Sequence, residues 1–453
     1  MTESAKPAPL RATDGILRVI EIMARLRDPE TGCPWDLKQD FRSMTKHVIE
    51  EAYEVAEAAD SGDTDHLREE LGDLLLQVIF YAQLAEEKGI FDINSIANGL
   101  ADKLISRHPH VFGDEQAATA DDVMRIWSAR KEAEKAQKLT APNDKPDYII
   151  SVPASLPAML RTTKLQEKKN KTGWDWATGQ DALNNIKDEI AEARAELNDE
   201  NPGALYQELG DVLFSVVATT RFLGFDPEAV LRACNHKFEG RIWGIEDILH
   251  AQGRRIENTS AQEIQDLWIE IKQHRKNGEF LTPRSPREDY FLNIPAALPA
   301  IRRTSQMEEK KNAMGWDWVS SDSALQKILD ELEEAVVELD INNRTALADE
   351  MGDVIFASIA CIRYIGYDPE EVLNAANDKF ERRFHVIEDR LHQEGRRLHQ
   401  ASASEIQDLW VAAKRQEKLS APVDKSAITA PRTMNGTFTR ESLDLPIYAV
   451  ANS

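Results

Sequence analysis

The chain has 453 residues, 42% of them hydrophobic and 30% charged, which is ordinary for a globular protein of two to four domains. Its formal charge of −24 and the absence of a basic stripe argue against nucleic acid binding as the main activity. The longest apolar stretch, residues 74–85, is too short to span a bilayer, and the N-terminal residues lack the order of a signal peptide, so we expect a cytoplasmic protein without membrane contact.

Helical patterns run through the whole chain. Residues 69–86, 208–223 and 350–365 begin with acids and continue as apolar runs longer than an ordinary strand, which predicts buried helices. Asp-Pro-Glu at residues 226–228 and 368–370 predicts an N-cap that opens a further helix. Ser260, and either Ser402 or Ser404, are predicted to open one more helix. We find no alternating strand pattern, so the predicted fold class is all-α.

The middle and the C-terminal parts of the chain repeat each other. A constant offset of 142 residues relates Gly173 to Gly315 and Trp268 to Trp410 without an insertion, which predicts duplication of a whole domain rather than a solenoid. We expect three domains, residues 13–138, 151–276 and 290–416, joined by polar linkers that contain proline. Residues 420–453 lose the helical pattern and are expected to be disordered.

All three repeats carry four acids as Glu-x-x-Glu and Glu-x-x-Asp, at one common spacing. Residues three apart share a helix face, and the polar turn between the motifs can fold one helix onto the other. Solvated surface acids are the commonest alternative. However, each Asp directly precedes the apolar run, where unpaired carboxylates are costly and where hard oxygen ligands suit Mg²⁺ or Mn²⁺. The predicted metal ligands are Glu51, Glu54, Glu70 and Asp73; Glu189, Glu192, Glu208 and Asp211; and Glu331, Glu334, Glu350 and Asp353.

Basic and aromatic residues recur after each acidic motif. A Lys and an Arg at i,i+4 face one way and would suit the phosphates of a metal-bound polyphosphate, with salt bridges to neighbouring acids as the alternative. A Trp-x-x-x-Lys pair follows, whose indole either stacks on a nucleobase or anchors a core. The pairs are Lys103 and Arg107, Lys237 and Arg241, Lys379 and Arg383, then Trp127 and Lys131, Trp268 and Lys272, and Trp410 and Lys414. The GWDW segments at residues 173–176 and 315–318 fit either a ligand contact or a packed turn.

Other chemistries fit the sequence poorly. No Gly-rich phosphate loop and no Gly-x-Ser-x-Gly is present, and a ferritin-like di-iron site would need Glu-x-x-His, which does not occur. Cys33, Cys234 and Cys361 are far apart and form no CxxC, so we expect small buried or half-buried side chains rather than disulfides or a zinc site.

The motifs together resemble the MazG family of bacterial nucleoside triphosphate pyrophosphohydrolases. GCPWD, EEAYE, ELGD and DKLISRHPHVF are similar to the N-terminal domain of that family. The second and third repeats both resemble the C-terminal domain of that family. The shared motifs are LPA, GWDW, DEIAE or DELEE, ELGD or EMGD, NHKFEGR or NDKFERR, and the terminal DLW-x-x-x-K. The resemblance covers the chain to about residue 415, and it departs from the usual two-domain pattern by this second C-terminal copy.

The resemblance implies a fold of tandem all-α domains with a four-helix core that is often completed by dimerisation, hence a homodimer. It implies Mg²⁺-dependent hydrolysis of a (d)NTP to (d)NMP and pyrophosphate for nucleotide-pool house-cleaning, with no nucleic acid partner. The acids of the second and third repeats would be metal ligands, with Glu189, Glu192, Glu331 and Glu334 as the catalytic group, although the general base is not assigned. The implied nucleotide-binding residues are Lys237, Arg241, Trp268, Lys272, Lys327, Lys379, Arg383, Trp410 and Lys414.

The repeats differ at a few positions near these residues. Ala101 in the first repeat replaces Asn235 and Asn377, so we rank that repeat lowest in activity. The third repeat offers Lys327 and Arg382 where the second has Asn185 and Gly240, and we expect the strongest site there. A hydrolase of dUTP or of a guanosine alarmone, and a non-catalytic helical scaffold, remain the alternatives.

Overall fold

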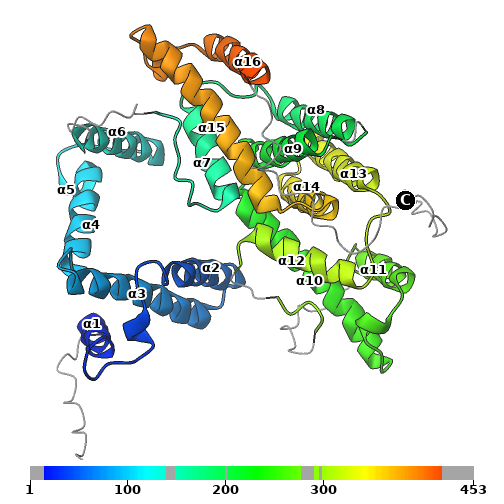
Figure 1. Cartoon of the computed structure of the whole chain (residues 1–453), viewed down its shortest axis with the longest axis horizontal. Coiled ribbons are helices and arrows are strands. Elements are labelled where there is room, and N and C mark those ends of the chain that lie inside the picture. The colour runs from blue at the N-terminus through cyan, green and yellow to red at the C-terminus, as the bar shows by residue number, and fades with distance from the viewer. Residues whose placement is uncertain (1–14, 139–147, 199–200, 277–289, 295–297, 421–453) are drawn as a thin grey trace, which may run out of the picture. The chain divides into compact units, whose positions relative to one another are not determined.

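The computed structural model describes residues 15–138, 148–198, 201–276, 290–294 and 298–420, and it divides into two compact units (Figure 1). All regular structure in these ranges is helical, which confirms the all-α prediction. No helix among the described residues is long and apolar enough to cross a membrane. The expected disorder of residues 420–453 falls, apart from Ser420, outside the described residues.

The first unit contains the first repeat. Its helices are α1 (Gly15–Leu26), α2 (Thr45–Ser61), α3 (Thr64–Glu87), α4 (Ile93–Arg107), α5 (Pro109–Phe112) and α6 (Ala120–Lys138), with a 3₁₀ turn at Asp36–Lys38. Gly62, in the left-handed region at φ 74°, ends α2, and the Asp63 side chain accepts hydrogen bonds from the first amides of α3. The polar segment therefore forms the predicted turn of a helical hairpin. A small core around Met23, Phe80 and Leu84 holds α1 against it.

The second unit contains the other two repeats, each with five α-helices in the same order. The second repeat has α7 (Ala158–Asn170), α8 (Gly179–Asn198), α9 (Pro202–Phe222), α10 (Pro227–Ala251) and α11 (Ala261–Lys276). The third repeat has α12 (Ala300–Ala313), α13 (Ser321–Asp340), α14 (Arg344–Ile365), α15 (Pro369–Gln393) and α16 (Ala403–Ser420). A 3₁₀ turn precedes the last helix of each repeat, at Ile256–Asn258 and Leu398–Gln400.

The helix-start predictions hold in this unit. Asp226 and Asp368 cap α10 and α15 through the amides of the first turn, with a proline at the first helical position. Ser260 and Ser402 accept hydrogen bonds from the amides of Glu263 and Glu405, so Ser402 rather than Ser404 opens the last helix. These side chains satisfy amides that have no partner within the helix.

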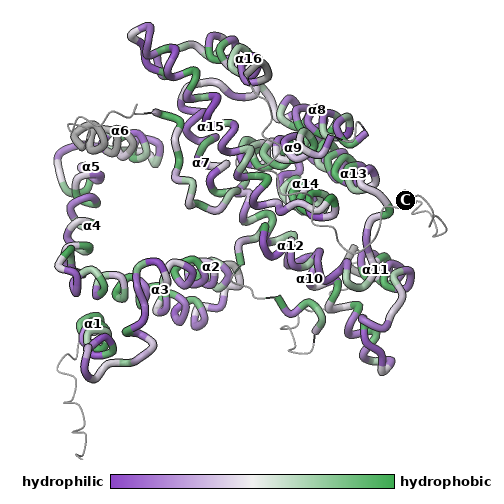
Figure 2. Tube along the Cα trace, viewed as in Figure 1, coloured by the Kyte–Doolittle hydropathy of each residue, from purple (hydrophilic) through white to green (hydrophobic). Residues whose placement is uncertain are grey.

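The two repeats of the second unit share one core, although we predicted them as separate domains. The hairpins α8–α9 and α13–α14 pack together as four helices, and Ile186, Leu213, Leu332 and Ile355 are all fully buried between them. Figure 2 shows the hydrophobic residues that run along α9 and α14. The boundaries at residues 151–276 and 290–416 therefore describe sequence repeats that fold as one body.

The helix after each hairpin packs on the other repeat. α10 lies against α14, and α15 lies against α9, while α7 contacts α15 and α12 contacts α10. Buried ion pairs hold this exchange: Arg303 donates to both oxygens of Glu239 at 2.9 Å, and Arg161 donates to Glu381 at 2.6 Å. Gly210 and Gly352 allow the close crossing, because a Cβ on either would lie 3.0 or 2.8 Å from a carbonyl oxygen of the crossing helix.

Candidate functional site

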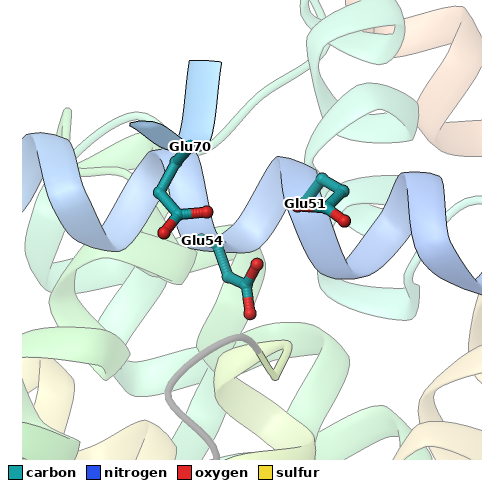
Figure 3. Close-up of side chains that lie close together, drawn as sticks. All are labelled: Glu51, Glu54 and Glu70. Carbon is teal, nitrogen blue, oxygen red and sulfur yellow. The ribbon is translucent and has the colours of Figure 1, made fainter. Parts of the chain in front are cut away.

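The predicted acids converge in every repeat. In each group of three, one oxygen from each carboxylate lies within 4.8 Å of the other two. Figure 3 shows the first group, with Glu51 and Glu54 on α2 and Glu70 on α3. The groups are Glu51, Glu54 and Glu70; Glu189, Glu208 and Asp211; and Glu331, Glu334 and Glu350. The fourth predicted acid of each repeat, Asp73, Glu192 or Asp353, falls outside the group.

Burial and the charges of neighbouring acids disfavour the ionised form of the clustered carboxylates. Burial, followed by the charge of Asp211, raises the pKa of Glu189 to about 7. Burial, followed by the charge of Asp353, raises the pKa of Glu350 to about 7, and the pKa of Glu54 rises to about 7 through burial and then Glu70. A bound cation would relieve this repulsion, and a set of oxygen donors alone fits Mg²⁺ or Mn²⁺.

In the second unit, the lysines that pair with the aspartates of the acid motifs come from the other repeat. Lys379 of α15 pairs with Asp211 of α9, and the Nζ of Lys237 on α10 lies 2.5 Å from an Oδ of Asp353 on α14. We expected each Lys and Arg pair to lie beside the acids of its own repeat, and that expectation is wrong for the second and third repeats. The reason is the helix exchange, which carries α10 and α15 away from their own hairpins.

The α9–α15 site, as we call it, combines the acids of α8 and α9 with α15 and α16. It contains a cavity of ≈ 240 Å³. Trp174 and Trp410 face each other there with ring centroids 5.3 Å apart, and Trp174 Nε1 donates to Gln407 at 2.9 Å. The GWDW turn thus lines the cavity, and Gly173 gives the positive φ of 77° that the turn requires. The predicted residues on its wall are Glu189, Asp211, Lys379, Arg383, Trp410 and Lys414.

The α14–α10 site combines the acids of α13 and α14 with α10 and α11. Its indoles repeat the first arrangement, since Trp268 and Trp316 have ring centroids 5.3 Å apart. The Arg241 guanidinium lies 5.1 Å from the centre of the Trp268 ring. The two sites differ at the acids, because here Cys234 Sγ donates to Asp353 Oδ1 at 2.9 Å. Lys272, also predicted to bind nucleotide, is exposed on α11.

The two extra cations of the third repeat do not act together. Lys327 pairs with Glu331 and therefore lies in the α14–α10 site. Arg382 lies on α15, the helix that serves the α9–α15 site, and its guanidinium is 3.6 Å from Glu417. Our expectation that both cations strengthen one site is wrong for the same reason as above. Which repeat is the more active stays a prediction.

Asn235 and Asn377 have a structural task. Asn377 accepts a hydrogen bond from the Thr162 hydroxyl at 2.8 Å and donates to the carbonyl of Ala158, both on α7. Asn235 binds α12 in the same way. Ala101 is exposed on α4 and cannot make these hydrogen bonds. The Asn to Ala difference therefore concerns helix anchoring, and the low activity that we expect of the first repeat stays a prediction.

Sequence reasoning missed the cation that lies behind the GWDW turn. Lys169 Nζ donates to Asp175 at 2.9 Å and lies 4.8 Å from the centre of the Trp176 ring. Burial lowers the pKa of Lys169, which lines the cavity together with Gln166. The signal was available, because LQEKKN and MEEKKN precede the two GWDW segments at the same spacing.

Comparison with known proteins identifies the family. The profile of the MazG nucleotide pyrophosphohydrolase domain matches residues 39–112, 177–242 and 319–387. A protein of Escherichia coli strain K12, named nucleoside triphosphate pyrophosphohydrolase, is 40% identical over 257 residues, which cover 56% of this chain and 96% of that protein. The chain belongs to the MazG family.

Two further relatives carry similar names. A Thermotoga maritima protein, named nucleoside triphosphate pyrophosphohydrolase/pyrophosphatase MazG, is 37% identical over 260 residues, 57% of this chain and 96% of that protein. A Mycobacterium tuberculosis protein named nucleoside triphosphate pyrophosphohydrolase is 35% identical over 158 residues, 34% of this chain and 46% of that protein. The three profile matches fall one in each predicted repeat.

Proposed function

We propose that this MazG-family chain is a nucleoside triphosphate pyrophosphohydrolase that converts a (d)NTP to a (d)NMP and pyrophosphate. The family and the names of its relatives support the reaction class. We further propose Mg²⁺ or Mn²⁺ as cofactor, nucleotide-pool house-cleaning in the cytoplasm as the role, and a homodimer as the assembly.

The observation that carries the proposal is the set of chemistries that line the α9–α15 cavity. The lining contains the carboxylates Glu189 and Asp211, three cations and two indoles; the cations are Lys379, Arg383 and Lys414, and the indoles are Trp174 and Trp410. A nucleoside triphosphate needs each of these: acids that can hold a metal for its phosphates, cations for further phosphate oxygens, and an aromatic surface for its base. The α14–α10 site offers the same residue types in Lys237, Arg241 and Trp268.

The residues of the α9–α15 site would have different roles in the reaction. Lys379 and Arg383 hold phosphate oxygens and offset the charge that develops on the leaving pyrophosphate. A water oxygen attacks phosphorus in line, the bond between the α- and β-phosphates breaks, and a carboxylate takes the water's proton. Glu192 and its equivalent Glu334 suit the last task because both are exposed. Bound Mg²⁺ would supply neutralisation of the triphosphate and polarisation of the water.

Pyrophosphate release by the full chain tests the proposal. The double variant Glu192→Gln, Glu334→Gln should lose release in both sites of the second unit while its helical content in circular dichroism stays unchanged. Glu333→Gln, an exposed neighbour on α13, is the matched control and should retain full activity. Retained turnover in the double variant would overturn the assignment. A panel of nucleotides that includes dUTP and guanosine alarmones identifies the preferred substrate.

A further inference from the structure

One buried amide in the α9–α15 cavity lacks a hydrogen-bond donor. Gln166 on α7 lines this cavity together with the indoles of Trp174 and Trp410, and only 2% of its surface is exposed. Its Oε1 has no hydrogen-bond partner among the residues that the structure describes. A buried carbonyl oxygen without a donor costs free energy, so its position in an aromatic cavity indicates a ligand that supplies the missing hydrogen bond.

The α14–α10 site has a carboxylate at the equivalent position. The repeat offset of 142 residues relates Gln166 on α7 to Glu308 on α12, and Glu308 is only 1% exposed. The surroundings repeat as well, because Trp316 Nε1 donates to Gln265 at 3.0 Å, as the first indole does in the other site. The two sites therefore differ in hydrogen-bonding capacity at one buried position.

The lysine one turn further along the helix follows this difference. In the α9–α15 site, Lys169 Nζ donates to Asp175. In the α14–α10 site, Lys311 Nζ lies 2.6 Å from Oε2 of Glu308 instead, and 5.7 Å from the centre of the Trp316 ring. The buried carboxylate thus has a cation beside it, next to the indole pair. An ionised carboxylate accepts hydrogen bonds and donates none, whereas an amide does both.

Nucleobases differ in what they offer to these two groups. Guanine carries two donors side by side, the ring N1–H and the 2-amino group, which match the two oxygens of one carboxylate. Adenine, cytosine and uracil place an acceptor next to a donor, and that acceptor would face a negatively charged oxygen. An amide pairs with a donor and an acceptor together, so it accommodates every base.

We propose that Glu308 makes the α14–α10 site selective for guanine nucleotides, whereas Gln166 lets the α9–α15 site accept any base. The selectivity comes mainly from rejection, because other bases place an acceptor against the carboxylate. This inference rests on the proposed function, since it takes the ligand to be a nucleotide, and it names the substrate class of each site. One polypeptide thereby serves two substrate ranges.

Equilibrium binding of nucleotides that resist hydrolysis tests the base preference without turnover. The probes are the α,β-methylene analogues of GTP, ITP and ATP, bound in the presence of Mg²⁺; the base of ITP is guanine without its 2-amino group. Lys379→Ala with Trp410→Ala silences the α9–α15 site, so that binding to the full chain reports the α14–α10 site. There the GTP analogue should bind at least about tenfold more tightly than the other two, because each of them loses a hydrogen bond to a charged group.

Substitution of Glu308 separates base selection from folding. In the same background, Glu308→Gln should weaken the GTP analogue alone and bring the three affinities within about threefold of each other. Glu309→Gln, an exposed neighbour on α12, is the matched control and should keep the full preference. In the mirror background, Lys237→Ala with Trp268→Ala, the α9–α15 site should bind all three analogues within about threefold.

Three binding results would overturn the proposal. They are equal binding of the GTP and ITP analogues at the α14–α10 site, an equal loss of all three analogues in Glu308→Gln, and a guanine preference at the α9–α15 site. Pyrophosphate release from ordinary nucleotides keeps the two proposals separate. No release together with the expected base preference would refute hydrolysis alone, whereas release without a base preference would refute the selectivity alone.

Discussion

Pairs of substitutions can show that each site of the second unit is built from two repeats. Lys379 lies beside Asp211, and Lys237 lies beside Asp353. Losing a hydrogen bond to a charged phosphate costs about 1.5 to 3 kcal/mol, which is roughly a 10- to 150-fold fall in kcat/KM at that site. With two equally active sites, Asp211→Asn or Lys379→Ala alone should leave about half of the wild-type rate.

Double variants distinguish sites that are built from two repeats from sites that are built within one repeat. Asp211→Asn with Lys379→Ala disables one site only and should again leave about half of the rate. Asp211→Asn with Lys237→Ala disables both and should leave less than about a tenth, as measured by pyrophosphate release at subsaturating substrate. If the second combination kept half of the rate and the first lost nearly all of it, each repeat would serve its own acids and the reasoning from the exchanged helices would be refuted.

Three further outcomes follow from the charges. Because the folded-state pKa of Glu189 is raised to about 7, the apoprotein loses stability as pH rises through that value. The rise in Tm that Mg²⁺ induces should therefore be larger at about pH 8 than at about pH 6, because the metal needs the ionised carboxylate. An equal rise at both pH values would contradict this prediction. Lys327→Asn removes the cation from Glu331 and should strengthen Mg²⁺ binding at the α14–α10 site, measured by calorimetric titration, and unchanged affinity would exclude this competition. Arg303→Met removes the guanidinium that pairs with the buried Glu239 and should cost about 3 to 5 kcal/mol in denaturant unfolding, most of it recovered by adding Glu239→Leu; no recovery would refute the charge explanation.

The sequence was sufficient for the predicted helices and for three of the four acids in each repeat, because these depend on local spacing. The apolar runs, the N-caps and the i,i+3 carboxylates are set within a few residues, and the structure has them where the pattern predicts. The polar turns also predicted the hairpins, and in the structure Asp63 caps the second helix of the hairpin in the first repeat and Asn343 does so in the third.

The pairing between repeats was beyond the sequence because two near-identical repeats offer equivalent partners. Whether Lys379 meets Asp353 or Asp211 depends on the direction in which the chain leaves the hairpin. A short connection around Gly366, which has a φ of 100°, sets that direction at α15. The role of Asn377 could not be predicted for the same reason, because it depends on the packing of α7 on α15.

The helix exchange gives this chain a freedom that an assembly of identical subunits lacks. In a symmetric homodimer, one codon change alters both active sites at once. Here Asn185 and Lys327, or Ala376 and Cys234, occupy equivalent positions in different sites of one polypeptide, so each site can be selected separately. Neither repeat can be discarded, however, because each supplies residues to the candidate site of the other, and the duplication is thereby preserved while the two sites diverge.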